Sequence, residues 1–307
     1  MLTNINLLTT HRCDLHCEHC LQGFPKKQLD LPVELLDKLF TEALTFGLKK
    51  VGLTGGEPHL HPRFDEIVEK INNYGLRWGI VSHGQRIAPY LPLINRYRNQ
   101  FDNIKLSIDS SDAALHDEIR GRQGVFENVT NSVKEYVANG VPVWVSSSLN
   151  QKNKGQVSSL VALAESLGAE GIVFAGTIPT SSNQHLMLSD QESLALYQEI
   201  TSWQKKANLN IKTASALYTK GGVNFCPVLS LNTANFNPNG EMIFCCDVDE
   251  DGDIIGSLRE QSFAQLLQQW LKVSAELQTK RVQMISEGKM IEGFDTCAFC
   301  SHFFISQ

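Results

Sequence analysis

The sequence predicts an α/β protein built on a partial (β/α)6 TIM-like barrel, followed by a small C-terminal β-hairpin plus helices. Short apolar runs of strand length alternate with stretches in which apolar residues recur every three or four positions, as on one face of a helix. Six such units fit into about the first 175 residues. A closed barrel has eight units and usually needs about 250 residues, so we expect an incomplete barrel.

The expected strands and helices follow one another in a regular order. The strands cover residues 4–8, 50–53, 78–82, 104–108, 141–147 and 171–175. The helices cover residues 32–46, 63–74, 89–98, 125–138 and 156–167. Strands joined by helices in this way form a parallel sheet, and right-handed crossovers curl it with the helices on the outside.

The alternation ends after Thr177. Residues 179–184 have the composition of a linker, and a helix is expected over 190–207. Asn239-Gly240 favours the positive φ angles of a tight β-hairpin turn. Two further helices are expected over 262–270 and 273–287. We therefore predict two domains, the barrel at residues 1–182 and a smaller domain at residues 183–307.

Composition excludes several classes of protein. The chain has 307 residues, of which 42% are hydrophobic and 20% charged, as in soluble globular proteins. The net charge is −6 and no Lys/Arg-rich block occurs, which disfavours nucleic-acid binding. No apolar run approaches the roughly 20 residues of a membrane span, and no signal peptide is recognisable. We expect a cytoplasmic protein whose thiols stay reduced.

The eight cysteines fall into two groups separated by a long interval without any. The first group is Cys13, Cys17 and Cys20, and the second is Cys226, Cys245, Cys246, Cys297 and Cys300. Disulfides are disfavoured in a reducing compartment, so metal binding is the preferred interpretation of both groups.

The first group forms a C-x3-C-x2-C pattern directly after the first strand. Three thiolates within one short loop can surround a single metal centre. A four-iron cluster held by three cysteines would keep one iron open to a ligand. The alternative is a zinc site, with His11, His16 or His19 as the fourth ligand.

Two other strands end in polar residues. The second strand leads into Gly55-Gly56-Glu57-Pro58, where the glycines permit a tight turn and close approach of a ligand. The fourth strand ends in Ser107-Ile108-Asp109-Ser110, which places hydroxyls and a carboxylate at the same edge of the sheet. In barrel enzymes the chemistry lies at the carboxyl ends of the strands, so these residues should converge with the cysteines.

The segments CDLHCEHC, TGGEP and SIDS, in this order and at these strand ends, resemble the radical S-adenosylmethionine (SAM) superfamily over about residues 3–178. The resemblance implies that Cys13, Cys17 and Cys20 hold a catalytic 4Fe–4S cluster whose open iron binds SAM. It also implies SAM contacts from six other residues: Gly55, Gly56 and Glu57 at the methionine amino group, Ser107 and Asp109 at the ribose or carboxylate, and His19 at the adenine. Separately, the place of Arg120 after the fourth strand indicates a contact with the SAM carboxylate. For Arg120, a salt bridge within the loop is the alternative.

The C-terminal cysteines resemble the short twitch form of the SPASM extension found in radical SAM enzymes. This resemblance implies an auxiliary 4Fe–4S cluster with four thiolate ligands, Cys226, Cys245, Cys297 and Cys300. A structural zinc is the alternative. Cys246 is left over, and it is either a buried small residue or a catalytic hydrogen-atom donor to a substrate radical.

The resemblance implies an enzyme that forms a 5′-deoxyadenosyl radical and abstracts hydrogen from a substrate. The first hypothesis is modification of a ribosomally synthesised peptide by crosslinking, epimerisation or backbone excision. The alternatives are dehydrogenation of a small metabolite and a non-catalytic metal-binding scaffold. Because the first strand begins at residue 4, we expect a peptide to be recruited by a separate recognition protein. A flavodoxin or ferredoxin is the expected reductant.

Overall fold

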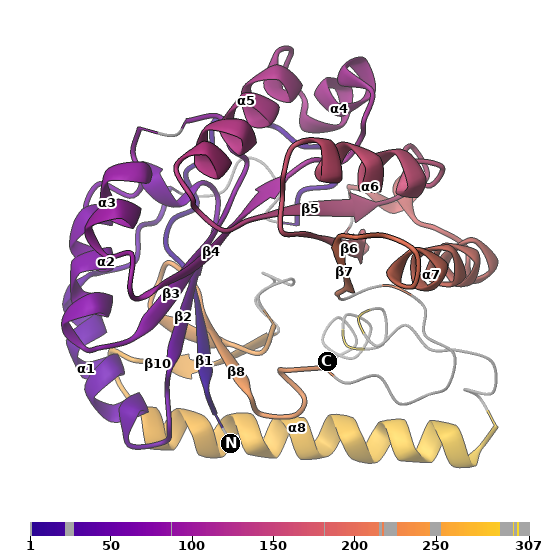
Figure 1. The fold of residues 1–307 in the computed structure, drawn as a ribbon. Coiled ribbons are helices and arrows are strands. Elements are labelled where there is room, and N and C mark those ends of the chain that lie inside the picture. Colours follow the sequence, from indigo (N-terminus) through magenta and orange to yellow (C-terminus); the bar gives the residue numbers. More distant parts are fainter. Residues whose placement is uncertain are drawn as a thin grey trace.

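One curved sheet forms the centre of the molecule, and helices cover its convex side (Figure 1). The structure is a computed structural model that describes residues 2–21, 28–86, 88–180, 182–214, 217, 226–245, 253–288, 297 and 300. The sheet has ten strands in the order β10-β9-β8-β1-β2-β3-β4-β5-β6-β7. Its two edges, β10 and β7, are not joined, so the barrel is open, as predicted.

The six predicted barrel strands are present and pair in parallel, each with the next. They are β1 (Asn4–Leu8), β2 (Lys50–Thr54), β3 (Arg77–Ser82), β4 (Phe101–Ser107), β5 (Val143–Leu149) and β6 (Gly171–Gly176). Their residues alternate between two environments. In β5, for example, Val143 and Val145 are buried, whereas Trp144 and Ser146 are half-buried. One face therefore packs on the helices and the other lines the barrel interior.

The predicted helices α1 (Glu34–Leu44), α2 (Phe64–Asn73), α3 (Leu91–Arg96), α5 (Val125–Ala138) and α6 (Val157–Ser166) are all present. The sequence prediction missed α4 (Ala113–Arg120) and the short helix η1 (Pro58–Leu60). Helix α4 begins at Asp112, whose carboxylate accepts a hydrogen bond from Leu115 N. Its buried face includes His116 and Arg120, so a search for apolar periodicity could not detect it.

The α/β alternation continues beyond residue 182. After η2 (Gln184–Leu186), helix α7 (Asp190–Gln204) leads to β7 (Asn210–Thr213), which pairs in parallel with β6. We did not predict β7, because Ile211 is the single large apolar residue in this four-residue strand. The predicted hairpin is present, and β8 (Thr233–Phe236) and β9 (Glu241–Ile243) flank the Asn239-Gly240 turn, where φ of Gly240 is 80°.

The hairpin belongs to the same sheet as the barrel. Strand β8 pairs in parallel with β1, and β10 (Ile254–Ser257) pairs antiparallel with β9. Asn6 donates a side-chain hydrogen bond to Asn235 (3.0 Å), which adds to the backbone pairing of β1 with β8. Strands from both predicted domains thus share one sheet, and the boundary at residue 183 stays a prediction.

Helix α8 (Phe263–Ser286) is one continuous helix where two were predicted. Its first turn packs beside α1 and β8, with the ring of Phe263 5.7 Å from that of Phe46 and 6.3 Å from that of Phe236. Lys38 donates to the carbonyls of Leu258 and Gln261, both at 2.8 Å. The predicted interruption falls at Leu271, which is exposed, so the apolar pattern changes there while the backbone continues.

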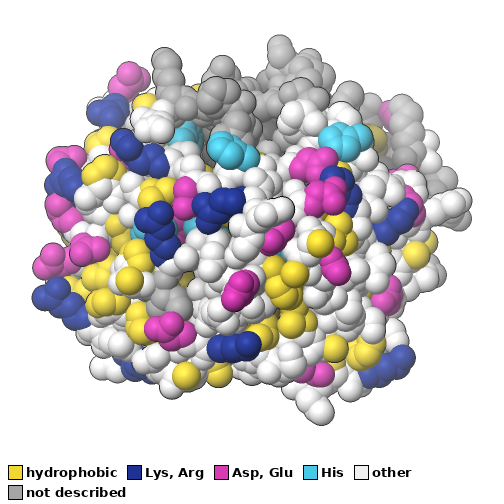
Figure 2. Space-filling model, turned by 90° about the horizontal axis from the view of Figure 1, so that it is seen from above, with side chains coloured by type: hydrophobic (Ala, Val, Ile, Leu, Met, Phe, Trp, Pro, Cys, Tyr) yellow, Lys and Arg dark blue, Asp and Glu magenta, His cyan; other side chains and the backbone are white. Residues whose placement is uncertain are grey.

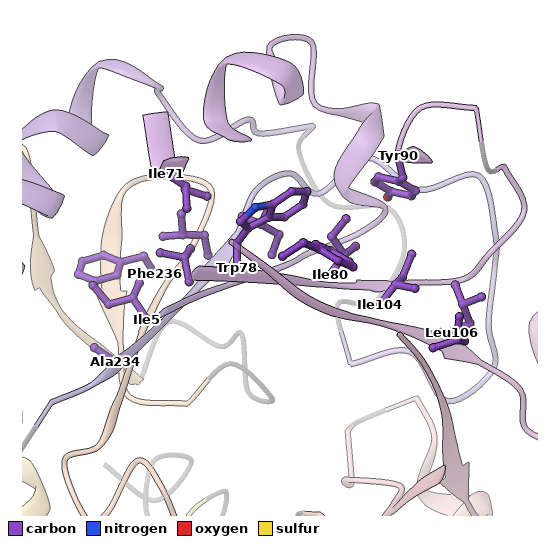
Figure 3. Close-up of a cluster of buried hydrophobic side chains, with 14 of the residues drawn as sticks. Ile5, Ile71, Trp78, Ile80, Tyr90, Ile104, Leu106, Ala234 and Phe236 are labelled. Atoms are coloured by element: carbon purple, nitrogen blue, oxygen red, sulfur yellow. The ribbon is translucent and has the colours of Figure 1, made fainter. Parts of the chain in front are cut away.

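The core lies between the convex face of the sheet and its helices. Side chains from β1, β3, β4, β8 and α2 meet there, among them Ile5, Ile71, Trp78, Ile104 and Phe236 (Figure 3). None of the described helices is both long and apolar enough to cross a membrane. On the face shown in Figure 2, acidic and basic side chains are interspersed among the coloured residues, without a broad basic patch.

Candidate active site

The three N-terminal cysteines lie in the loop that follows β1, at the carboxyl ends of the parallel strands. We call residues 11–20 the cysteine loop. Cys13, Cys17 and Cys20 are all half-buried. Burial, with smaller contributions from Glu57, Cys17 and Cys20, raises the pKa of Cys13 to about 12. The three thiols thus lie on one short loop, and their role as cluster ligands stays a prediction.

Gly55 and Gly56 allow the cysteine loop to lie directly on the end of β2. Gly56 N donates to Thr10 O, and Glu57 N donates to Arg12 O, both at 2.7 Å. A Cβ atom on Gly56 would lie 2.2 Å from Arg12 O, and one on Gly55, whose φ is +131°, would lie 2.6 Å from Thr10 O. Any larger residue would therefore push the loop away from the strand.

Glu57 is completely buried, and its carboxylate has partners from within the protein. Ser82 Oγ donates to it at 2.7 Å and His83 N at 3.0 Å. Tyr90 OH also donates to it, and His59 Nδ1 lies 3.1 Å away. Burial alone would raise the pKa of Glu57, but His83, His59 and Tyr90 outweigh it, so the pKa is lowered and the group is ionised.

His83 is a site residue that the sequence analysis missed. Its Nε2 lies 2.7 Å from Asp14 Oδ1 and 3.2 Å from Glu57 Oε2, and its Nδ1 accepts from Gln85 N at 3.2 Å. Because Nδ1 is an acceptor, the ring proton is on Nε2, between the two carboxylates. His83 directly follows β3, so the rule that polar residues at strand ends form the site could have found it.

Asp109 and Arg120 form a buried ion pair that extends to a cysteine. Arg120 Nε lies 2.7 Å from Asp109 Oδ2, and its Nη1 lies 3.8 Å from Cys17 Sγ. Asp109 Oδ1 accepts from Ser148 N at 2.9 Å. His19 Nε2 is 3.8 Å from Asp109 Oδ2, and burial lowers the pKa of His19 to about 4, so its ring is neutral. Arg120 therefore forms a salt bridge, which is the role that the sequence analysis gave as the alternative to binding SAM.

Helix α4 supports the other side of the cysteine loop. Gly121, in the left-handed conformation (φ 70°), ends this helix, and a Cβ atom there would lie 2.3 Å from His16 O. Glu18 N donates to Ile119 O at 3.0 Å. The Glu18 carboxylate pairs with Lys152 at 2.6 Å and with His185 at 2.8 Å. Contacts from the ends of several strands and helices thus fix the loop.

Ser107 is half-buried and lies on the interior face of β4, where its backbone pairs with Ser146. Its hydroxyl makes no hydrogen bond with the residues that the structure describes. The structure therefore collects all ten N-terminal residues predicted for the site at the carboxyl ends of β1, β2 and β4 and the end of α4: Cys13, Cys17, His19, Cys20, Gly55, Gly56, Glu57, Ser107, Asp109 and Arg120.

The second cysteine group is described in part. Cys226, Cys245 and Cys297 are half-buried and Cys300 is buried. Cys245 follows β9, and its N–H donates to Asp253 Oδ2 at 3.1 Å. The four-cysteine ligand set stays a prediction. Cys246, the predicted catalytic residue, lies outside the described residues.

The first cysteine group fits an iron–sulfur cluster better than a single zinc ion. Zinc–sulfur bonds are about 2.3 Å long, which brings tetrahedral thiolates to about 4 Å from one another. Among the described residues, one group of three ligand atoms lies within a mutual 4.8 Å, and it is Cys13, Asp14 and His83. The three cysteines are thus too widely spaced for one zinc ion, and none of His11, His16 and His19 completes a compact set with them.

A thiolate site supported by buried carboxylates at the carboxyl ends of parallel strands defines an open α/β-barrel protein of the iron–sulfur class. The sequence model of the Radical SAM superfamily matches residues 7–150, and this part of the chain is a Radical SAM domain.

Relatives with named activities match just over half of the chain. The antilisterial bacteriocin subtilosin biosynthesis protein AlbA of Bacillus subtilis is 27% identical over 167 residues, covering 54% of this chain and 37% of AlbA. A PqqA peptide cyclase of Methylocella silvestris is 30% identical over 185 residues, covering 58% of this chain and 48% of the cyclase. The chain thus spans between a third and a half of the length of these relatives.

Similarity of fold to solved structures extends over a larger part of the chain than the sequence similarity does. The crystal structure of Streptococcus suis SuiB bound to S-adenosylmethionine superposes with a TM-score of 0.73 at 16% identity, covering 88% of this chain and 66% of SuiB. SuiB has also been solved bound to the precursor peptide SuiA, with a TM-score of 0.71. The likeness confirms the open-barrel fold and extends it beyond residue 150.

Proposed function

We propose that this protein forms a 5′-deoxyadenosyl radical from SAM and uses it to abstract hydrogen from a ribosomally synthesised peptide, leading to crosslinking, epimerisation or backbone excision. The observation that carries the proposal is the cysteine loop, which rests on Gly55 and Gly56 within the part of the chain that matches the superfamily. When bound, the 4Fe–4S cluster would supply the electron that cleaves the sulfonium of SAM.

Different residues at the carboxyl ends of the strands would hold the cluster and SAM. Cys13, Cys17 and Cys20 would ligate the catalytic cluster, since metal binding deprotonates thiols even when burial raises their pKa. The guanidinium of Arg120, 3.8 Å from Cys17 Sγ, would stabilise the thiolate form.

The predicted SAM contacts would act in two ways. The carboxylates of Glu57 and Asp109 already have protein partners, so they would act through the backbone and side chains that they position. The hydroxyl of Ser107 is free of described partners and would bind SAM directly. Gly55, Gly56, His19 and Arg120 complete the proposed SAM-binding set.

We also propose an auxiliary 4Fe–4S cluster held by Cys226, Cys245, Cys297 and Cys300. Two facts support it: these are four thiols, as one such cluster needs, and the strand β8 that begins the hairpin pairs with β1, whose end starts the cysteine loop. A fully ligated cluster would accept or pass electrons without binding substrate.

The peptide substrate is supported by the relatives, of which one is named a peptide cyclase, one is named for bacteriocin biosynthesis, and a fold neighbour was solved with its precursor peptide. We propose that a separate recognition protein presents the peptide and that a flavodoxin or ferredoxin in the cytoplasm is the reductant.

The test is anaerobic reconstitution with iron and sulfide, followed by iron and zinc analysis and assay of 5′-deoxyadenosine. About eight irons per chain are expected for two clusters. The triple variant of Cys13, Cys17 and Cys20 to Ala should retain about half of the iron and form no 5′-deoxyadenosine. Stoichiometric zinc without iron would refute the proposal. A precursor peptide that gains a crosslink or loses hydrogen only with the intact enzyme would establish the substrate class.

A further inference from the structure

The side chain of Arg120 reaches from the end of α4 to the sulfur of a predicted cluster ligand. Its Nη1 donates to Cys17 Sγ at 3.8 Å, which is the hydrogen bond that the guanidinium makes with the described residues. Asp109 Oδ2 lies 2.7 Å from Arg120 Nε, but these two atoms are not aligned as donor and acceptor. The carboxylate therefore attracts the guanidinium by its charge, while the directed contact goes to the sulfur.

Both charges of this ion pair are shielded from water. The side chain of Arg120 is 9% exposed, and that of Asp109 is completely buried. Charges in such surroundings are screened much less than charges at the surface. The guanidinium contacts Cys17 directly, and its electrostatic effect on that sulfur is larger than the opposing effect of Asp109. The pair as a whole therefore favours negative charge on Cys17.

The backbone of α4 fixes the guanidinium against the cysteine loop. Ile119 O accepts from Glu18 N at 3.0 Å, and a Cβ atom on Gly121 would lie 2.3 Å from His16 O. Ile119 and Gly121 are the two chain neighbours of the arginine, and His16 and Glu18 are the two chain neighbours of its cysteine partner. The contact between the two side chains is thus held by a backbone contact on each side of it.

We propose that Arg120 raises the reduction potential of the catalytic 4Fe–4S cluster through its contact with Cys17, and that Asp109 limits this effect. Reduction adds one electron to the cluster, and a cation beside a ligand sulfur stabilises the reduced state. An electron carrier can then reduce the cluster more easily. The carboxylate acts in the opposite direction, because its charge repels the added electron. This role is separate from the SAM contact proposed above, since it acts on the cluster before SAM binds.

This inference rests on the proposed function for its cluster, and its test measures a potential. The reconstituted holoenzyme without SAM is titrated with reductant under anaerobic conditions while the EPR signal of the reduced cluster is followed. The signal of the catalytic cluster is the one missing from the triple variant of Cys13, Cys17 and Cys20 to Ala. Arg120→Gln keeps an N–H donor but removes the charge. It should lower the equilibrium constant for reduction by about tenfold or more, and tenfold corresponds to about 59 mV for a one-electron couple.

Replacing the carboxylate should shift the potential in the opposite direction. Asp109→Asn removes the negative charge of the pair and should make the cluster easier to reduce. Arg120→Lys retains a positive charge, so its potential should lie between those of the native protein and Arg120→Gln. If Arg120→Gln is too unstable to reconstitute, the double variant with Asp109→Asn replaces it, because this variant leaves no unpaired buried charge. Its potential should be lower than that of Asp109→Asn alone.

Arg122→Gln is the matched control. Arg122 Nη1 donates to Asp14 O at 3.1 Å and so also lies beside the cysteine loop, but its side chain is 39% exposed. Water and salt screen a charge in that position, so the potential should stay close to the native value. A shift in Arg122→Gln as large as that in Arg120→Gln would overturn the proposal. A lower potential in Asp109→Asn would do the same.

The two hypotheses fail in different ways. Formation of 5′-deoxyadenosine together with an unchanged SAM-free potential in Arg120→Gln would refute the effect on the cluster and leave the proposed function in place. Weaker SAM binding by that variant at an unchanged potential would assign Arg120 to SAM alone. The expected shifts in a protein that forms no 5′-deoxyadenosine would refute the proposed function and leave the role of Arg120 toward the cluster.

Discussion

His83 Nε2 lies 2.7 Å from Asp14 Oδ1, and this contact joins the cysteine loop to the end of β3. Asp14 directly follows Cys13, and the same imidazole nitrogen is 3.2 Å from the buried carboxylate of Glu57. The hydrogen bond from His83, together with Arg122, holds the pKa of Asp14 below its usual value. One buried ring thus connects the thiolate loop with the Gly-Gly-Glu turn after β2.

Replacing His83 should loosen the Cys13 end of the loop. His83→Phe removes the donor between two carboxylates, and a buried acceptor without its partner costs about 1–3 kcal/mol. We expect lower thermal stability of the apoprotein and weaker SAM binding by the reconstituted enzyme, measured by titration of the reduced cluster's EPR signal. His83→Gln retains a donor and should recover part of both. Identical SAM affinity in the Phe and Gln variants would argue against this positioning role.

Gly56→Ala should prevent the cysteine loop from docking on β2, since its Cβ would lie 2.2 Å from Arg12 O. The backbone cannot shift without breaking the hydrogen bond from Glu57 N to Arg12 O. We expect about half of the reconstituted iron to be lost. Gly155→Ala is the control, because a Cβ there meets nothing within 4 Å. Full iron content in Gly56→Ala would mean that the loop does not depend on this contact.

Gly121 and Gly124 offer a matched pair at the other side of the loop. Both have left-handed φ angles, 70° and 79°, so an alanine at either strains the backbone by about 1 kcal/mol. A Cβ at Gly121 would also lie 2.3 Å from His16 O, whereas one at Gly124 meets nothing within 4 Å. Denaturant titration should therefore show a larger loss for Gly121→Ala, accompanied by reduced cluster content. Equal losses would indicate that backbone strain alone is responsible.

Arg120→Met should reverse the way in which Asp109 makes the stability of the apoprotein depend on pH. Burial alone would raise the pKa of Asp109, but the charge of Arg120 outweighs it, so in the native protein Asp109 stabilises the fold above its ordinary pKa and loses this contribution as pH falls. Without Arg120, burial dominates and the pKa rises above the unfolded value. The variant should then lose stability as pH rises.

Urea denaturation at pH 5 and pH 8 tests this reversal. Breaking one partner of a buried ion pair costs about 3–5 kcal/mol, and the loss should be greater at pH 8. Arg120→Met combined with Asp109→Asn removes the unpaired charge and should recover most of the stability at pH 8. A loss of equal size at both pH values would show that Asp109 remains ionised without Arg120.

The choice between Cys245 and Cys246 as a cluster ligand is open to a direct experiment. We expect Cys245→Ala to lose the iron of one cluster and Cys246→Ala to retain about eight irons per chain. If Cys246 donates a hydrogen atom to a substrate radical, Cys246→Ala should still consume SAM and give an altered product. Iron loss in Cys246→Ala with retention in Cys245→Ala would reverse the assignment.

The sequence by itself determined the elements whose pattern is local. Apolar residues recur with the period of a strand or a helix because one face of each element is buried, and this predicted β1 to β6. The Asn239-Gly240 turn located the hairpin because a positive φ angle, 80° at Gly240, is a local preference of glycine. The thiols and the polar residues after β1, β2 and β4 converge because parallel strands end at one edge.

Only the tertiary structure decided which of these groups are partners. Glu57 is bound by Ser82, His83 and Tyr90, and Asp109 by Arg120 and Ser148, all of which come from other strand ends or helices. It also decided that β8 pairs with β1 and that a seventh parallel strand follows α7. The reason is physical: periodicity records whether a side chain is buried, whereas the identity of its neighbour depends on how distant segments pack.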